Sequence, residues 1–323
     1  MNPKRILVIQ TAFIGDVILA TSTVETLKSE FPESEIDFLV RKGNETLFEN
    51  NPNVSALLVW DKKQNKLSNL FKIIREARSN QYDLLINIQR YLSTGLVALF
   101  SGAKHKIGFT QNPMSFCYDR KIQHDMSQGI HEIHRNHELI DHIVSNEPKM
   151  PKLYPSQDQI DAVSEYKSED YITIAPASVW YTKQYPKEKW IEFLSHTEFK
   201  GKVYLLGAPN DVELSDEIIS KTSREDVINL CGKVSFLESA ALMKDAKMNY
   251  VNDSAPLHIC SAMNAPVTAI YCSTVPNFGF GPLSDNSRIV EAYKELKCRP
   301  CGFHGHKQCP EGHFKCGYII NLD

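Results

Sequence analysis

Short apolar runs alternate with helical stretches along most of the chain, and this alternation constrains the fold more than any other feature. The first run, residues 5–10 (RILVIQ), precedes a polar loop and an amphipathic stretch from Val17 to Glu30 that stops at Phe31-Pro32. Buried parallel strands read as short apolar runs, and helices connect them. The pattern therefore predicts an α/β fold with a parallel sheet and helical crossovers.

The alternation occurs twice, on either side of a proline-rich segment at 146–155. In the first half, further strands are expected at 35–40, 54–60 and 82–89, and helices at 65–80, 93–101 and 129–144. In the second half, strands are expected at 171–175, 202–206, 248–252 and 267–271, and helices at 187–197, 211–221, 236–245 and 254–263. The prolines of the segment suit neither a helix nor a central strand, so we interpret it as an interdomain linker. Two such halves predict an active site in the cleft between them, outside the carboxyl ends of the strands.

Composition limits the class of protein. A length of 323 residues with 42% hydrophobic residues suits about two domains and excludes a disordered chain. The formal net charge of -3 gives no overall attraction to nucleic acid, which we do not expect as a partner. The sequence has no apolar run long enough for a membrane span, and its first residues lack a signal-peptide core, so we expect a cytoplasmic protein.

The loop from Thr11 to Asp16 joins the first predicted strand to the first predicted helix. Gly15 can bring the backbone close to a ligand, and an acidic side chain at a helix start is by default a cap. However, this loop lies at the ligand-binding edge of a parallel sheet, and it lacks the Gly-x-Gly-x-x-Gly of a dinucleotide site. Asp16 is therefore a candidate for either a cap or a general base.

Candidate phosphate ligands follow strands of the second half. Ser178, Thr182 and Lys183 offer hydroxyl and ammonium donors, although a lone lysine in a loop is usually solvated. Residues 252–258 (NDSAPLH) end a strand and start a helix, whose free N–H groups and dipole favour phosphate. His258 fits a core position or a ligand contact, and Asp211, at another helix start, fits a cap or a contact to a ribose diol.

In this order, these segments resemble glycosyltransferase family 9, the heptosyltransferases of the lipopolysaccharide inner core. The resemblance runs from Ile6 to about Cys316. Its most specific parts are residues 14–21 (IGDVILAT), 183–186 (KQYP), 207–209 (GAP) and 253–258 (DSAPLH), with Gly281-Pro282.

The resemblance implies a GT-B architecture of two Rossmann-like domains facing across a cleft. Residues 1–150 would bind the acceptor, residues 151–297 would bind the nucleotide-sugar donor, and residues 298–323 would form a cysteine-rich tail. The implied reaction is inverting transfer of heptose from ADP-heptose to a lipopolysaccharide core acceptor of the lipid A/Kdo type.

The resemblance also implies roles for single residues. Asp16 matches the general base, whereas Lys183 and Ser178 match residues on the diphosphate and ribose of the donor. Asp211 falls where relatives often have a glutamate that holds the ribose, and Asp253, Ser254 and His258 fall at the diphosphate and sugar. Relatives usually have glycine where this chain has Ala255. Because Lys183 and the helix start at Ser254 can neutralise the leaving diphosphate, we expect no catalytic metal.

The acceptor site is less well marked by the sequence. Arg90 occupies a position where many relatives have glycine, and it could contact an acidic acceptor together with Lys104, Lys106 and Arg120. A solvated basic face explains these residues equally well. An acceptor anchored in a lipid implies a location in the cytoplasm or peripherally at the inner membrane, with weak membrane contact.

Four cysteines are concentrated near the C-terminus, at positions 298, 301, 309 and 316. The spacing of Cys298, Cys301, Cys309 and Cys316 is close to that of a structural zinc knot. Reduced or disulfide-forming cysteines are the alternative.

Two other functions remain open from the sequence. One is a GT-B glycosyltransferase that uses another nucleotide sugar, because nothing at Asp211 or Ser178 visibly selects adenine over uracil. The other is a non-catalytic nucleotide-binding protein with a zinc-knot tail.

Overall fold

The computed structural model describes residues 2–322 and divides into two compact units, Met1–Tyr154 (unit 1) and Pro155–Asp323 (unit 2). Met1 and Asp323, at the outer ends of the predicted first domain and tail, lie outside the described residues. Among the residues that are described, no helix is both long and apolar enough to cross a membrane.

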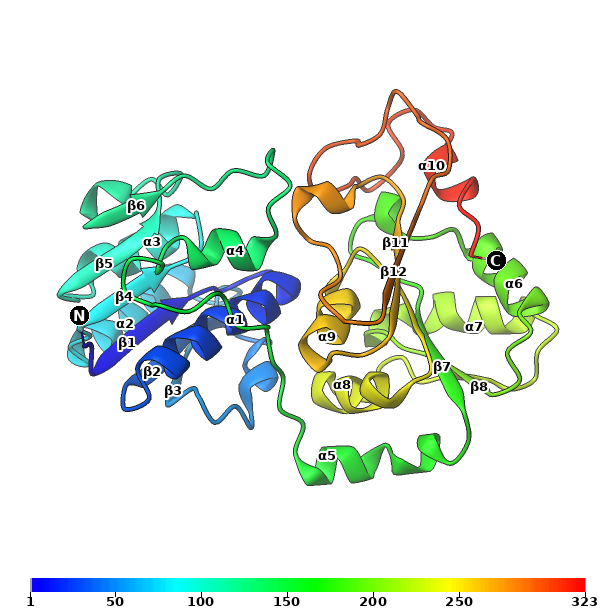
Figure 1. Ribbon diagram of the computed structural model, residues 1–323, viewed down its shortest axis with the longest axis horizontal. Coiled ribbons are helices and arrows are strands. Elements are labelled where there is room, and N and C mark those ends of the chain that lie inside the picture. Colours follow the sequence, from blue (N-terminus) through cyan, green and yellow to red (C-terminus); the bar gives the residue numbers. More distant parts are fainter. Residues whose placement is uncertain (1, 323) are drawn as a thin grey trace. The chain divides into compact units, whose positions relative to one another are not determined.

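Each unit alternates strands and helices (Figure 1). The strands of unit 1 are β1 (Arg5–Ile9), β2 (Glu35–Arg41), β3 (Ala56–Trp60), β4 (Leu84–Asn87), β5 (His105–Phe109) and β6 (Arg120–Ile122). Its helices are α1 (Ile14–Glu30), α2 (Lys66–Ser79), α3 (Leu92–Phe100) and α4 (Glu132–His137). The strands of unit 2 are β7 (Tyr171–Ala175), β8 (Lys202–Leu205), β9 (Val227–Asn229), β10 (Asn249–Asn252), β11 (Val267–Tyr271) and β12 (Ser287–Glu291). Its helices are α5 (Gln157–Ala162), α6 (Lys187–His196), α7 (Val212–Lys221), α8 (Phe236–Asp245), α9 (Ala255–Met263) and α10 (Lys315–Tyr318).

The two sheets have the same topology. Within residues 2–322, the order is β3-β2-β1-β4-β5-β6 in unit 1 and β12-β11-β10-β7-β8-β9 in unit 2, and all strand pairs are parallel. In unit 1, α1 packs against α4 and α2 against α3; in unit 2, α6 packs against α7 and α8 against α9. Helices on both faces of a parallel sheet explain why β4, β7 and β11 are buried along their whole length. The prediction of two parallel-sheet α/β domains is confirmed.

The strands that the sequence did not indicate lie at or near sheet edges. The four are β5 and β6 in unit 1 and β9 and β12 in unit 2. Their sequences carry fewer buried apolar residues than the central strands; β12, for example, buries only Val290. The predicted helix at 129–144 is wrong in length, because α4 ends at His137 and hydrogen-bonded turns continue to Val144.

Helix α1 is not amphipathic as predicted, because most polar residues in its middle are also buried, namely Thr21, Ser22, Thr23, Glu25 and Thr26. The backbone of the predicted linker lies along them. The N–H of Lys149 donates to Thr26 Oγ1 (2.9 Å), the Ser22 hydroxyl donates to the Lys149 carbonyl (2.5 Å), and the N–H of Lys152 donates to Thr21 Oγ1 (3.0 Å). The hydroxyl groups of α1 therefore satisfy backbone N–H and C=O groups of a segment that has no regular secondary structure.

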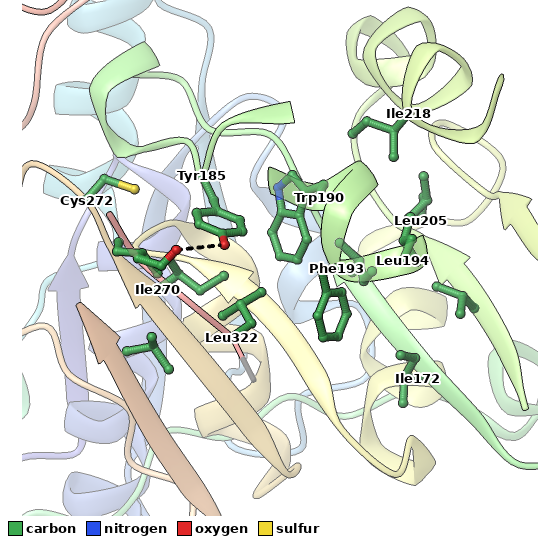
Figure 2. Packing of buried hydrophobic residues seen from close by; sticks show 14 of the residues in the cluster. Ile172, Tyr185, Trp190, Phe193, Leu194, Leu205, Ile218, Ile270, Cys272 and Leu322 are labelled. Atoms are coloured by element: carbon green, nitrogen blue, oxygen red, sulfur yellow. Dashed lines mark hydrogen bonds between the residues drawn. The ribbon is translucent and has the colours of Figure 1, made fainter. Parts of the chain in front are cut away.

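The core of unit 2 includes residues of the cysteine-rich tail. Figure 2 shows Trp190, Phe193 and Leu194 of α6 packed with residues of the sheet and with Leu322. Phe314, Cys316 and Ile320 are buried in the same cluster, and the Tyr185 hydroxyl donates to the Ile320 carbonyl (3.2 Å). The cysteine-rich tail is thus an integral part of unit 2.

Candidate functional site

Each sheet reverses its strand order between its first and fourth strands, β1 and β4 in unit 1 and β7 and β10 in unit 2. Ligands of doubly wound folds bind outside the carboxyl ends of the strands at this point. Asp16 and Arg90 follow β1 and β4. Lys183 and Asp253 follow β7 and β10 in the same way. Sequence-predicted residues therefore occupy both switch points.

Side chains from three neighbouring strand ends hold the loop after β1. Gln89 donates to the Ala12 carbonyl (2.9 Å), and its amide oxygen accepts from the N–H (3.3 Å) and the hydroxyl of Thr11. Asn44 donates to the Thr11 carbonyl (3.0 Å), and Lys62 Nζ donates to Thr11 Oγ1 (2.8 Å). These contacts fix the backbone that leads into α1.

Asp16 lies in the first turn of α1 and is partly buried. Its Oδ2 accepts the N–H of Phe13 (2.9 Å), so the carboxylate does serve as a helix cap. Burial, together with the negative charge of Glu132, raises the pKa of Asp16 to about 6, against the lowering effects of the Phe13 N–H and of Arg90. A carboxylate that titrates near neutral pH at a switch point is suited to general base catalysis.

A buried group of charged side chains lies near Asp16, and it was not predicted from the sequence. His124 Nε2 lies 2.9 Å from Glu132 Oε2, and Arg135 Nη2 lies 2.7 Å from the same oxygen. Arg90 Nη1 contacts His124 Nδ1. The available signal was the i, i+3 pair Glu132 and Arg135, which lies in the sequence among His131, His134 and His137.

The four cations predicted at the acceptor site are not together. The positive charge of Arg90 lowers the pKa of Asp16. Lys104, in contrast, precedes β5, at the amino-terminal end of that strand, and pairs with Asp83 (2.7 Å). Lys106 Nζ donates to the Ala103 carbonyl (2.8 Å), and Arg120 pairs with Asp141 (2.6 Å). The structure does not bring these three to Asp16.

Lys62 is a cation near the site that the sequence analysis did not single out. Its Nζ lies 4.3 Å from the centre of the Trp60 ring, in addition to its bond to Thr11. Burial, with Arg41 and Lys66 nearby, lowers the pKa of Lys62 to about 8. It therefore still carries a positive charge at pH 7.

The switch point of unit 2 holds an ion pair. Lys183 Nζ lies 2.7 Å from Asp253 Oδ2, which also accepts the Thr274 hydroxyl (2.6 Å). Lys183 ends a 3₁₀ turn, Tyr181–Lys183. Because an ammonium group has three N–H donors, this arrangement orients Lys183 and leaves donors for an anionic ligand. Ser178 lies on the same loop, and its carbonyl accepts from Gln184 (2.6 Å).

Thr182, a predicted donor-binding residue, is used internally. It is 1% exposed, and its hydroxyl oxygen accepts the N–H of His306 (2.8 Å) and the hydroxyl of Ser273 (3.0 Å). The Thr182 N–H donates to the His306 carbonyl (3.1 Å). Thr182 therefore attaches the cysteine-rich tail to the loop that carries Lys183.

Helix α9 begins next to Asp253. Ser254 is its N-cap residue but makes no side-chain cap hydrogen bond, and Pro256 lies in the first turn. Ala255, the first helical residue, brings a Cβ to this helix start. His258 is buried one turn further, with its ring centre 6.3 Å from that of Phe280.

Asp211 caps a turn after β8. Its Oδ2 accepts the N–H of Ala208 (2.8 Å). Gly207 is required here, because a Cβ would lie 2.9 Å from the side chain of Asp211 and 2.9 Å from Cys231 Sγ. The default interpretation of Asp211 as a cap agrees with this hydrogen bond, and a ribose contact stays a prediction.

The tail cysteines are free thiols in the structure. Burial and the neighbouring cysteines raise the pKa of Cys316 to about 11, so the four thiols lie close enough to influence one another. Even so, among residues 2–322 no three Cys, His, Asp or Glu side chains are placed to hold a metal ion. The predicted zinc knot stays a prediction, and one equivalent of zinc in protein purified without chelator would establish it.

Comparisons with known proteins agree with this architecture. The model of glycosyltransferase family 9 (heptosyltransferase) matches residues 70–314. Lipopolysaccharide heptosyltransferase 3 of Escherichia coli is 26% identical over 306 residues, covering 89% of this chain and 89% of the relative. Among solved structures, a family 9 glycosyl transferase from Veillonella parvula aligns with a TM-score of 0.81 at 22% identity, covering 89% of this chain and 86% of its own. The E. coli ADP-heptose lps heptosyltransferase II aligns with a TM-score of 0.78 at 21% identity, covering 92% and 95%. These likenesses confirm the predicted GT-B fold.

Proposed function

Because the chain belongs to glycosyltransferase family 9 and is therefore a glycosyltransferase, we propose that it transfers heptose from ADP-heptose to a lipopolysaccharide core acceptor with inversion. The observation that carries the proposal is the Asp16 carboxylate at the switch point of unit 1, with its pKa raised to about 6. Relatives named as lipopolysaccharide heptosyltransferases support the choice of sugar and acceptor.

The proposed reaction is a single displacement. The oxygen of an acceptor hydroxyl forms a bond to the anomeric carbon while the bond from that carbon to the diphosphate breaks. Asp16 takes the hydroxyl proton, and ADP leaves with the bonding electrons. Attack from the face opposite the leaving group inverts the configuration, and a carboxylate that titrates near neutrality suits the proton transfer.

The donor is proposed to bind at the switch point of unit 2. Lys183 is held by Asp253 at 2.7 Å and can direct its remaining N–H donors to the diphosphate. The start of α9, from Ser254, adds backbone N–H groups and the positive end of a helix dipole. Together they offset the charge that develops on the leaving diphosphate, so the proposal includes no catalytic metal. Ser178, Asp211 and His258 complete the proposed donor site.

The acceptor is proposed to contact unit 1 near Asp16. Lys62 and Arg90 are cations at the same edge of the sheet, and both are anchored by hydrogen bonds. An acidic group on a core sugar would meet these two side chains. Because Lys104, Lys106 and Arg120 are engaged elsewhere, we leave them out of the proposed site.

A lipid-linked acceptor also suggests weak contact with a membrane, for which α2 offers a surface. Leu67 and Phe71, one turn apart on α2, are 70% and 69% exposed. Exposed Lys66, Lys72 and Arg75 flank them on the same helix. An apolar strip with flanking cations is typical of helices that rest on anionic lipid surfaces.

Sedimentation with phosphatidylglycerol vesicles tests this surface. Wild-type protein should partition onto the vesicles, and Leu67→Ser with Phe71→Ser should reduce partitioning about tenfold. The matched control is Tyr293→Ser, which removes an equally exposed apolar side chain (69%) from unit 2. Equal partitioning of wild type and the α2 variant would contradict the proposed contact.

Calorimetric titration tests the donor. ADP and ADP-heptose should bind to the purified protein, and UDP-sugars should not. Binding of UDP compounds alone would assign another nucleotide sugar to the same fold. Binding of ADP-heptose without transfer to any core acceptor would favour a non-catalytic nucleotide-binding protein.

A further inference from the structure

Four side chains of unit 1 form a connected charged group beside Asp16, and we call Arg90, His124, Glu132 and Arg135 the Glu132 cluster. His124, Glu132 and Arg135 are 7%, 5% and 2% exposed. Removing charged groups from water costs several kcal/mol per ion, and apolar side chains of similar size would often serve stability as well. Because stability alone does not account for these buried charges, we relate the cluster to the reaction of the nearby candidate base.

The donors and acceptors of the cluster can be assigned from geometry. A guanidinium group only donates, so His124 Nδ1 accepts from Arg90 and His124 Nε2 carries the proton that it donates to Glu132. Arg135 donates to the same carboxylate through Nε (2.8 Å). Although burial acts in the opposite direction, these partners hold the pKa of Glu132 below its ordinary value. Glu132 is thus a fixed negative charge.

Glu132 and Asp16 lie on two helices that pack against each other. Helix α4, which begins at Glu132, packs against α1, which carries Asp16. Two charged side chains influence the Asp16 carboxylate: Glu132 from α4 favours its protonated form, and Arg90 from the loop after β4 favours its ionised form. His124, from the segment after β6, and Arg135 surround Glu132 and set its position.

We propose that Glu132, fixed by His124 and Arg135, is a positioning residue for glycosyl transfer that acts on the Asp16 carboxylate and touches neither sugar. By its repulsion it makes Asp16 a stronger acceptor for the hydroxyl proton when the new sugar bond forms. Glu132 itself exchanges no proton. This inference rests on the proposed function, because it takes Asp16 as the general base.

The direct test is titration of the Asp16 carboxyl carbon by ¹³C NMR, with the signal assigned by Asp16→Asn. In Glu132→Gln the midpoint should fall by roughly one pH unit, because a like charge is removed. Glu25→Gln is the matched control: Glu25 is also a buried carboxylate with hydrogen-bond partners, but it lies further along α1 and bonds to Tyr154 (2.9 Å) and Asn53 (3.0 Å). Its midpoint should equal that of wild type. An unchanged midpoint in Glu132→Gln would overturn the inference.

A second readout is the pH profile of heptosyl transfer. The acid limb of kcat should move to lower pH in Glu132→Gln while KM for ADP-heptose stays constant, and a purely structural role would leave the limb in place. The NMR titration requires no turnover and can be carried out even if the protein transfers no heptose. Absence of transfer would contradict the proposed function, whereas the titration would still show whether Glu132 changes the pKa of Asp16.

A double variant keeps the test possible if Glu132→Gln alone does not fold. Glu132→Gln alone leaves the Arg135 guanidinium buried without its counter-charge, which can unfold the protein. Glu132→Gln with Arg135→Gln removes both charges and should still lower the Asp16 midpoint, because the removed negative charge is the one that acts on Asp16. A midpoint at or above that of wild type in the double variant would also overturn the inference.

Discussion

Unit 1 and unit 2 order their strands identically, and in both the candidate site follows the first and fourth strands. The carboxylates at these two places differ in their partners. Asp253 in unit 2 pairs with Lys183 at 2.7 Å, whereas Asp16 in unit 1 has a backbone N–H at 2.9 Å and the negative charge of Glu132 nearby. One topology thus supports an anion-binding site in one unit and a proton acceptor in the other. The topology determines where the candidate site lies in each unit, and a few residues near the strand ends determine whether it binds an anion or accepts a proton.

Removing the base should give the largest difference between the units. Asp16→Asn should lower kcat by roughly 10²- to 10⁴-fold, because the acceptor proton loses its carboxylate. The dissociation constant of ADP should stay unchanged, since the nucleotide is assigned to unit 2. Steady-state kinetics and calorimetry measure the two quantities. Wild-type activity in this variant would remove Asp16 from the mechanism.

Removing the cation of unit 2 should have the converse effect. Lys183→Ala should weaken ADP binding by roughly 10- to 100-fold, because it deletes a charge-assisted hydrogen bond and leaves Asp253 unpaired. Lys187→Ala is the control, since Lys187 also forms an ion pair, with Glu217 (2.7 Å), and is not assigned to the donor site. Equal ADP affinity in wild type and Lys183→Ala, measured by calorimetry, would show that the phosphate site lies elsewhere.

The raised pKa of Asp16 should also make the stability of the protein depend on pH. The pKa of Asp16 is raised from 3.8 to about 6, so the folded state binds this proton more tightly than the unfolded state. The stability contributed by this group therefore falls as pH rises from about 4 to 6, and the loss is complete above pH 6. Asp16→Asn should be more stable than wild type at pH 8 by about 3 kcal/mol.

Urea denaturation at several pH values checks this prediction. The advantage of Asp16→Asn should shrink below pH 6 and disappear near pH 4. A constant difference across this range would mean that the variant acts through packing or the helix cap and not through ionisation.

A substitution at Thr182 distinguishes a role in donor binding from a structural role within unit 2. Thr182→Val should leave ADP affinity within a factor of two or so and destabilise unit 2 by roughly 1 kcal/mol, because two buried donors lose their acceptor. Thermal denaturation and ADP titration separate the two effects. A large loss of ADP affinity in a stable variant would restore Thr182 to the donor site.

The fold was predictable where burial is complete and poorly predictable where it is not. The central strands β1, β4, β7, β10 and β11 read as apolar runs, and each was expected from the sequence. The missed strands β5, β6, β9 and β12 lie at or beside sheet edges, where fewer apolar residues are needed. Because β5 was missed, the edge on which Lys104 lies could not be known from the sequence.

The candidate site was predictable where a residue follows a strand and unpredictable where it depends on packing. Asp16, Lys183 and Asp253 stand at strand ends, so topology alone places them at the switch points. Glu132 reaches Asp16 only because α4 packs on α1, and no local pattern specifies that contact. The use of Thr182 depends on where the backbone of His306 passes, more than a hundred residues later.

The inclusion of the tail in the core of unit 2 has a consequence for synthesis of the chain. All strands of unit 1 are complete by residue 122, whereas the core of unit 2 needs Phe314, Cys316, Ile320 and Leu322. At about 5 to 20 residues per second, unit 1 can close on the ribosome on the order of ten seconds or more before unit 2. Ribosome-bound chains halted at residue 300 should therefore resist protease through unit 1 and be cut throughout unit 2. The loop that carries Lys183 would mature later than unit 1, because Thr182 can make its contacts only after His306 has been synthesised.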